Sequence, residues 1–459
     1  MLATTRGNWA SRLGFILAAA GSAIGLGNIW RFPYATGKSG GGLFYLVYIL
    51  CVVLVGLPIM MAEVLLGRAT QSSPIVAFRQ LTHRRSPWTL LGWMGVLTGF
   101  LILSYYSVVA GWTVHYVVLS VKNAFVGQST EAIGQLFSTL VADPFANVGY
   151  HGLFMALTVA VVIGGVRAGI ERWSRILMPT LFVMLVGLTV YCVFLDGFDD
   201  AARFVFAPHT KDFKPASVLS ALGQSFYSMS LGMGAMLTYG SYLPRDTGIP
   251  KSAVWVAVLD TVIATLASLV VFPITFSFGM EAEAGPGLIF KSIPLAFSQM
   301  TGGYVLSIVF FVLIAFAALT STISLQEVVT SSFIDLYGWS RRKVCLVSGA
   351  AIFLFGIPSA LSGGSTFGAL LKGVTGKTFF DWVDHLTVNW MLPLGGLALA
   401  IFTGFVLQSA TRRQEFQHGT TWGATYGMWL PLLRYVGPLA VLLVFAQSSG
   451  LLRLLGIDW

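Results

Sequence analysis

The chain has 459 residues, of which 56% are hydrophobic and only 10% are charged, and its mean hydropathy is +0.79. This composition excludes a water-soluble fold with a charged shell and predicts an all-α polytopic membrane protein. The net charge of +9 does not require a nucleic-acid partner, because an excess of basic residues on one side of a membrane explains it.

Apolar runs of about 20 residues, the length that crosses the hydrocarbon of a bilayer, recur along the chain. They predict eleven membrane-spanning helices near residues 12–36, 42–66, 88–121, 151–166, 173–195, 216–243, 252–279, 303–335, 344–361, 380–408 and 428–450. No hydrophilic run is long enough for a soluble domain, so residues 1–459 are predicted to form a single domain. No cleavable signal peptide is evident, so the first span is expected to stay in the mature protein.

Charge predicts the orientation of these spans. The segments assigned to one side hold sixteen basic groups against four acids, whereas the opposite loops hold nine of each. The positive-inside rule then puts the N-terminus in the cytoplasm, and an odd number of spans leaves the C-terminus outside.

Paired glycines interrupt the first and sixth spans, at Gly25-Leu26-Gly27 and Gly232-Met233-Gly234. Glycine costs about 1 kcal/mol relative to alanine inside a helix, and backbone freed in lipid needs new partners. Small residues also let helices pack closely. Two breaks at corresponding places in two halves favour a binding site near the membrane midplane instead. We expect inverted repeats over about 9–196 and 216–408, with an additional helix over about 428–450.

The residues around the breaks offer groups for an ion and a zwitterion. Unwinding of the first break would free carbonyls for a small cation and amides for a carboxylate. Asn28 adds an oxygen for a hard cation, although it could equally bond a neighbouring helix. At the second break Ser228 and Ser230 supply hydroxyls, unless these bond their own backbone, and Tyr227 and Met233 supply apolar walls.

Five acids are assigned to apolar spans, and each is a functional candidate because a carboxylate in hydrocarbon is costly: Glu63, Asp260, Glu327, Asp381 and Asp384. Asp260 has no basic residue within one helical turn, so it either binds a cation or is protonated and bonds another helix. Glu63 and Glu327 are expected either to serve function directly or to brace an unwound helix by accepting its amides.

In the eighth span, Thr320 and Ser321 form a hydroxyl pair that suits an oxygen-only sodium site. No phosphate-binding glycine loop, His-Glu-x-x-His or Gly-x-Ser-x-Gly motif is present. We therefore expect no enzyme activity and no organic cofactor, and energy would come from an ion gradient.

With these residues in view, the chain resembles the neurotransmitter:sodium symporter family, and most closely its bacterial amino-acid transporters with the LeuT-type fold. The resemblance runs from Trp9 to about Leu451, and its most specific segment is Gly25-Leu26-Gly27-Asn28-Ile29-Trp30-Arg31-Phe32-Pro33. It implies a five-plus-five inverted repeat with helices 1 and 6 broken, in the bacterial cytoplasmic membrane, with no obligatory protein partner.

The resemblance also implies the ligands of two sodium ions. One ion would be held by the Ala23 carbonyl, Asn28, Ser228, Asp260 and the substrate carboxylate. The second would lie between the Gly21 and Ile24 carbonyls and a set from the eighth span, namely the Ala317 carbonyl, Thr320 and Ser321.

An amino-acid substrate is implied in the same way. Its carboxylate would meet the Leu26 and Gly27 amides and the Tyr106 hydroxyl. Its ammonium would meet Ala23, Tyr227 and Ser230. Its side chain would meet Ile102, Met233, Ser321 and Leu325, and Ser228 also lies at the site.

Gates follow from the resemblance as well. Arg31 with Asp384, over a lid of Tyr106 and Tyr227, resembles an outer gate. Arg6 with Asp335, near Trp9 and Tyr242, resembles an inner gate. The segment from Gly169 to Pro179 matches a family pattern at which the fifth helix unwinds to let water reach the second sodium.

Two departures from the family matter. Tyr48, Gln224 and Ser228 reproduce most of the set that chloride-dependent relatives use, but Ala264 replaces a further Ser, and Asp260 stands where many relatives have Asn. The fixed charge of Asp260 predicts chloride-independent transport. The twelfth span of eukaryotic members is also missing.

The function expected is therefore sodium-coupled symport of a neutral amino acid, with a hydrophobic or aromatic side chain, by alternating access. Coupling to protons instead of sodium, or transport of glycine or a small amine, stays open. A channel or a receptor is disfavoured, because no ring of repeated pore-lining groups is evident.

Overall fold

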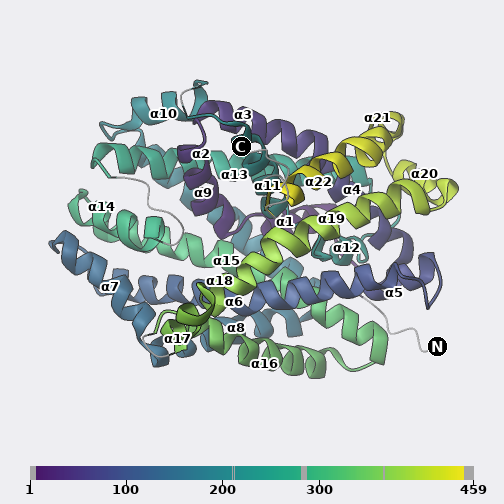
Figure 1. Cartoon of the computed structure of the whole chain (residues 1–459), viewed down its shortest axis with the longest axis horizontal. Coiled ribbons are helices and arrows are strands. Elements are labelled where there is room, and N and C mark those ends of the chain that lie inside the picture. Colours follow the sequence, from purple (N-terminus) through teal and green to yellow (C-terminus); the bar gives the residue numbers. More distant parts are fainter. Residues whose placement is uncertain (1–6, 209, 211, 281–286, 365–366, 449–459) are drawn as a thin grey trace.

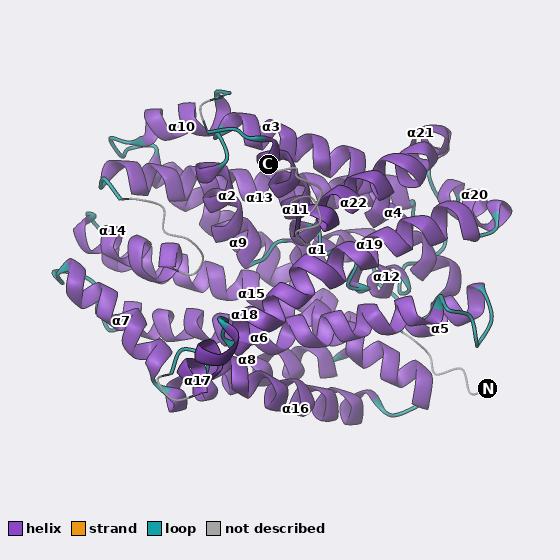
Figure 2. Ribbon diagram, in the orientation of Figure 1, coloured by secondary structure: helices purple, strands orange, loops and turns teal. Residues whose placement is uncertain are grey.

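In the computed structural model the chain folds into a bundle of helices. The structure describes residues 7–448 apart from 209, 211, 281–286 and 365–366. No strand occurs among the described residues (Figure 2). Nine helical segments in this part of the chain are long and apolar enough to cross a membrane, and the bent pair at the first break makes ten. The remaining predicted span, 216–243, consists of two short helices on either side of the second break.

Both predicted breaks occur. α1 (Arg12–Ala23) ends where Ile24 turns to an extended conformation, and the chain then continues through a π-helical turn, η1 (Gly27–Arg31), into α2 (Phe32–Lys38). The two parts are bent by 55°. α11 (Pro215–Ser228) and α12 (Ala235–Gly240) are separated by a non-helical stretch with positive φ at Ser230, Gly232 and Gly234.

The other spanning segments are built from long helices with occasional π-helical turns. Five of these spans are single helices: α6 (Thr89–Val121), α8 (Pro144–Ile163), α13 (Ile249–Ser277), α15 (Gly303–Tyr337) and α16 (Arg341–Ala360). Two more are α3 (Gly42–Cys51) continued by η2 (Val52–Gly56) and α4 (Leu57–Thr70), and η3 (Val166–Glu171) continued by α9 (Arg172–Cys192). The last two are α18 (Phe379–His385) continued by η5 (Leu386–Met391), α19 (Leu392–Ile401) and η6 (Phe402–Val406), and η7 (Gly423–Thr425) continued by α21 (Tyr426–Pro431), η8 (Leu432–Val436) and α22 (Gly437–Ser448).

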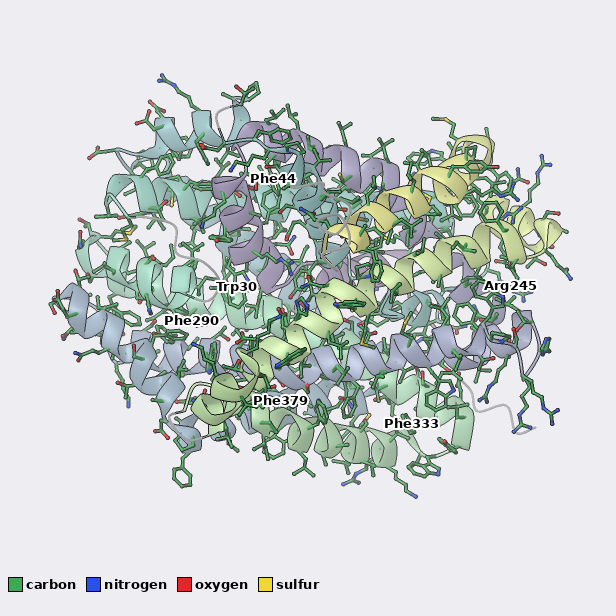
Figure 3. All side chains as sticks on the ribbon, in the orientation of Figure 1. Trp30, Phe44, Arg245, Phe290, Phe333 and Phe379 are labelled. Atoms are coloured by element: carbon green, nitrogen blue, oxygen red, sulfur yellow. The ribbon has the colours of Figure 1, made fainter. Side chains whose placement is uncertain are left out.

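Short helices close the two ends of the bundle (Figure 1). α7 (Thr130–Ala142), α10 (Phe198–Phe206) and α14 (Ile293–Gln299) lie at one end, and α14 follows the turn η4 (Leu288–Ser292). α5 (Pro74–Leu81) and α20 (Ser409–Gln417) lie at the other, where Figure 3 places Arg245. α17 (Phe367–Thr375) precedes α18.

Two boundaries differ clearly from the sequence prediction, namely the starts of the fourth span and of the fifth, which was expected at 173–195 but begins at Val166. The fourth span was expected at 151–166, but α8 begins at Pro144, where the Asp143 side chain caps it by accepting the amides of Phe145 and Ala146. Polar Asn147 lies inside this helix because its side chain is buried and bonds the Trp112 indole. Tertiary contacts therefore lengthen the helix beyond its apolar stretch.

Candidate functional site

The two unwound segments meet in the middle of the bundle, where Figure 3 labels Trp30 just beyond the first break. The Ser230 hydroxyl donates to the Ser22 carbonyl at 2.8 Å, so the second break satisfies backbone that the end of α1 leaves free. Ser22 in turn donates to Ser324 of α15 at 2.7 Å. Polar backbone at this depth is thus paired within the protein, as a membrane interior requires.

The glycines of the breaks are needed because other groups approach their backbone. A Cβ on Gly25 would lie 2.7 Å from the Ser321 hydroxyl oxygen and 2.8 Å from that of Tyr106. Gly232 has a φ of +80°, and a Cβ there would lie 2.4 Å from the Leu392 carbonyl oxygen. The groups that approach Gly25 are hydroxyls, which can bind a ligand. Close packing of apolar helices alone would not explain this glycine.

A small inner cavity of about 30 Å³ lies between the breaks. It is lined by most residues that the sequence assigned to the substrate, namely Ala23, Gly27, Ile102, Tyr106, Tyr227, Ser228, Ser230, Met233, Ser321 and Leu325. Leu26 lines the neighbouring outer cavity instead. The sequence prediction missed Ser22, Gly25 and Ser324 as lining residues, although Ser324 follows Ser321 by one helical turn and shares its face.

Where the inner and outer cavities adjoin, a backbone amide and a phenol converge. The Leu26 amide donates to the Tyr106 hydroxyl oxygen at 3.1 Å, and both residues are buried. This amide lies at the start of the helical segment formed by η1 and α2, where the helix dipole favours negative charge. The arrangement can bind a carboxylate.

The polar residues predicted for a first sodium ion are brought together. The Asp260 carboxylate accepts from Asn28 Nδ2 at 2.7 Å and from the Ser228 hydroxyl at 2.7 and 2.8 Å. Tyr48 donates to the same carboxylate at 3.0 Å. Asp260 is fully buried, and a buried carboxylate requires such donors or a cation to offset its desolvation.

A second group of oxygens surrounds Ser321. Its hydroxyl oxygen lies 3.3 to 3.5 Å from the carbonyl oxygens of Gly21, Ser22, Ile24 and Ala317. Thr320 bonds the Ala317 carbonyl at 3.0 Å. One hydroxyl proton can serve only one of the four carbonyls well, so this cluster has spare oxygen lone pairs for a hard cation.

The two predicted outer-gate residues line one larger cavity of about 270 Å³, next to the inner one. Tyr106 and Tyr227 line both cavities and therefore lie between them. The Arg31 guanidinium lies over the Tyr227 ring, 4.6 Å from its centre. Within the described chain, no ion pair of 4 Å or less joins Arg31 to Asp384, so the predicted outer pair is apart in this conformation.

The opposite side of the site is closed by the start of α1. The Trp9 indole donates to the Tyr239 carbonyl at 2.9 Å, and the Trp9 amide donates to the Tyr242 carbonyl at 3.1 Å. Trp9 and Tyr242 are both buried. Asp335 accepts the Ser73 amide at 2.7 Å. Its predicted partner Arg6 lies outside the described residues.

The remaining acids of the apolar spans have different surroundings. Glu63 accepts the Gly232 amide at 2.7 Å, as expected for a carboxylate that braces a break. Glu327 accepts no amide of a break; it pairs with Arg341 at 2.6 Å and accepts from Tyr242. Asp381 lies in the span Phe379–Val406, as assigned, but at its very start, where it is exposed and forms a capping box with Thr378 at the start of α18.

The chain is similar in sequence to known sodium-dependent transporters. The profile of the sodium:neurotransmitter symporter family matches residues 6–132 and 146–444. The chain is 40% identical to an uncharacterized sodium-dependent transporter, YhdH, of Bacillus subtilis, over 97% of this chain and 98% of that protein. It is 33% identical to an uncharacterized sodium-dependent transporter of Haemophilus influenzae, over 96% and 98% of the two chains.

Among solved structures, the chain is similar to MhsT in complex with L-phenylalanine. The TM-score is 0.88 and the sequence identity is 41%, over 96% of this chain and all of that one.

Proposed function

The chain belongs to the sodium:neurotransmitter symporter family, and from this premise we propose that it couples the entry of a neutral, hydrophobic or aromatic L-amino acid to sodium. The observation that carries the proposal is the arrangement around Asn28. A cluster suited to a cation, with Ser228 and Asp260, adjoins the Leu26 amide and Tyr106 hydroxyl that suit a carboxylate. An ion and an amino acid bound there would share a charge contact.

The proposed substrate class is supported by the walls of the inner cavity. Ile102, Met233 and Leu325 are apolar, and none of the described residues that line the cavity is an acid or a base that could pair with a charged side chain. The similar structure of MhsT holds L-phenylalanine. These observations favour an apolar or aromatic side chain over glycine or a small amine, because a small ligand would leave the apolar walls unfilled.

Two sodium ions are proposed, and both are transported substrates. The first would bind Asn28, Ser228, Asp260 and the Ala23 carbonyl. The second would bind the Ser321 hydroxyl oxygen, whose long contacts with carbonyl oxygens it would replace. Its further ligands would be the Gly21, Ile24 and Ala317 carbonyls and Thr320. Oxygen-only ligand sets of this kind suit hard cations.

We also propose that transport is independent of chloride. The Tyr48 and Ser228 hydroxyls, which belong to the set used by chloride-dependent relatives, here donate to the Asp260 carboxylate. Ala264, which is buried, offers no hydroxyl to an anion. A fixed carboxylate and a free chloride would repel each other at this spacing.

Alternating access is the proposed mechanism. From the outer cavity, substrate would pass Tyr106 and Tyr227, which would then close beneath an Arg31 and Asp384 contact. The inner closure around Trp9 and Tyr242 would open next. We propose a cytoplasmic membrane location with the N-terminus inside and the C-terminus outside, as the charge distribution predicts.

Uptake of a panel of labelled amino acids by proteoliposomes tests the substrate claim. Sodium outside is compared with equimolar potassium. We expect saturable uptake of phenylalanine, leucine or a similar amino acid in sodium only. Sodium-dependent uptake confined to glycine or a small amine would overturn the substrate class, and uptake that needs only a proton gradient would overturn sodium coupling.

A further inference from the structure

We propose that Glu171, the last residue of η3, is a positioning residue for transport, because its carboxylate holds the start of α1 against η3 and the first turn of α9 and so sets how readily the inner side of the pathway opens. The inference rests on the proposed alternating access. Glu171 is not among the ion, substrate or gate residues described above. Its contacts join two elements that are far apart in the sequence.

The carboxylate makes three polar contacts, two with residues at the start of α1 and one with Arg175 of α9. One oxygen accepts the Ala10 amide at 2.7 Å. The other accepts the Ser11 hydroxyl at 3.3 Å and pairs with Arg175, one turn further along α9, at 2.9 Å. Ser11 is also the residue that caps α1, since its hydroxyl accepts the Gly14 amide at 2.9 Å. Glu171 therefore accepts both the Ala10 amide and the hydroxyl of the capping residue Ser11. Its negative charge also lies at a helix N-terminus, which favours it.

Packing fits this role. Glu171 is 2% exposed, and its side chain lies directly on the backbone of Gly14. A Cβ on Gly14 would lie 2.0 Å from a carboxylate oxygen of Glu171, so only glycine leaves room for the carboxylate there. Nearby, Arg167 donates to the Asn8 carbonyl at 2.8 Å. A buried, multiply bonded carboxylate of this kind holds its partners in one arrangement.

The anchored segment carries the inner closure and leads to the second ion cluster. Trp9, which closes the site against Tyr239 and Tyr242, lies directly before the Ala10 amide that Glu171 binds. At the other end of α1, the Gly21 and Ile24 carbonyls face Ser321. α1 is a continuous helix of twelve residues between these points, so movement of its start requires loss of the Glu171 contacts and disturbs the ion cluster.

The test compares Glu171→Gln and Glu171→Ala with the unmodified protein in nanodiscs. An amide keeps the shape but has one acceptor oxygen instead of two and no charge for Arg175. Hydrogen–deuterium exchange is measured for peptides from residues 8–23 in sodium, and substrate binding is titrated with sodium. We expect faster exchange of these peptides and a half-saturating sodium concentration raised on the order of tenfold, with the maximal substrate binding kept.

A matched control is Glu415→Gln. Glu415 also pairs with an arginine, the buried Arg68 of α4, at 2.9 Å, and among the described residues it makes no polar contact with α1 or α9. The Glu415→Gln substitution should leave the hydrogen–deuterium exchange of residues 8–23 unchanged. If Glu171→Ala does not fold, Arg175→Ala serves as the second variant and should give the same direction with a smaller effect, because the Ala10 contact is kept.

Unchanged exchange of residues 8–23 in the Glu171→Gln protein, or an equal increase in the Glu415→Gln protein, would overturn the inference. The exchange measurement needs no transport. A failure of the proposed function would show separately, as absence of sodium-dependent binding in the unmodified protein.

Discussion

Asp260 places a carboxyl group where Asn28, Ser228 and Tyr48 converge as hydrogen-bond donors. An amide at this position would offer one oxygen, no charge and two hydrogens that face other donors. The residue therefore decides both the affinity for a cation and the need for an anion. It is the single side chain on which most of the proposed ion chemistry depends.

Replacement of Asp260 by Asn is expected to raise the half-saturating sodium concentration of substrate binding by about tenfold or more, which corresponds to about 1.4 kcal/mol. A sodium titration of labelled substrate binding measures this. The double variant Asp260→Asn with Ala264→Ser should regain binding in chloride but not in gluconate, because it supplies a hydroxyl for an anion in place of the carboxylate. An Asp260→Asn protein with unaltered sodium dependence would contradict the assignment.

Ser321→Ala is expected to weaken sodium dependence without preventing folding. It removes the hydroxyl at the centre of four carbonyl oxygens and leaves the cation one ligand short. Ser332→Ala on the same helix is the control, because that buried hydroxyl donates to the Val328 carbonyl of its own helix and, in the described part of the chain, to no group near Ser321. The half-saturating sodium concentration should rise for Ser321→Ala alone, and equal effects of the two changes would speak against an ion there.

Among the elements, the break between α11 and α12 depends on a partner from α4. Glu63 accepts the Gly232 amide, and without it that buried amide would lack this acceptor. Glu63→Ala should lower the free energy of unfolding by about 1–3 kcal/mol, the cost of an unsatisfied buried donor. Thermal unfolding in detergent measures the change. Glu131→Ala, which removes an exposed carboxylate of α7, should have almost no effect, and equal stability of both variants would refute the bracing role.

Much of the helix arrangement could be predicted from the sequence. Apolar runs locate the long helices, and paired glycines locate both breaks, because each is a local signal. The start of α8 could not be predicted, since burial of Asn147 against Trp112 is a tertiary effect. The role of Asp381 could not be predicted from the apolar run around it, because its capping box with Thr378 starts the helix at the end of the span.

The site was predictable only in part. Residues on the breaks, such as Asn28 and Ser228, are marked by their unusual setting and by the family resemblance. The contacts of Glu327 depend on Arg341 from the next helix, which a single sequence does not pair with it. The contact between Glu171 and the Ala10 amide joins residues 161 positions apart, so no local signal reveals it.

At the scale of the whole molecule, the outer cavity at Arg31 and Asp384 and the buried Trp9 on the opposite side of the site fit the proposed alternating access. Tyr34 lines the outer cavity, is partly exposed, and supplies a probe of access from this side. In a background without Cys51, Cys192 and Cys345, a Tyr34→Cys protein should react with a membrane-impermeant thiol reagent from outside in sodium. Added substrate should slow the reaction, since it favours closure over the cavity, and a reaction rate that substrate leaves unchanged would contradict the proposed closure.

The central claim is that a sodium gradient drives accumulation of an amino acid through this bundle. The most direct measurement is concentrative uptake of labelled phenylalanine or leucine into proteoliposomes, with sodium, proton and chloride gradients imposed one at a time and gluconate replacing chloride. The account predicts accumulation above the external concentration with an inward sodium gradient, equal in chloride and gluconate. Accumulation driven by a proton gradient in the absence of sodium would contradict it.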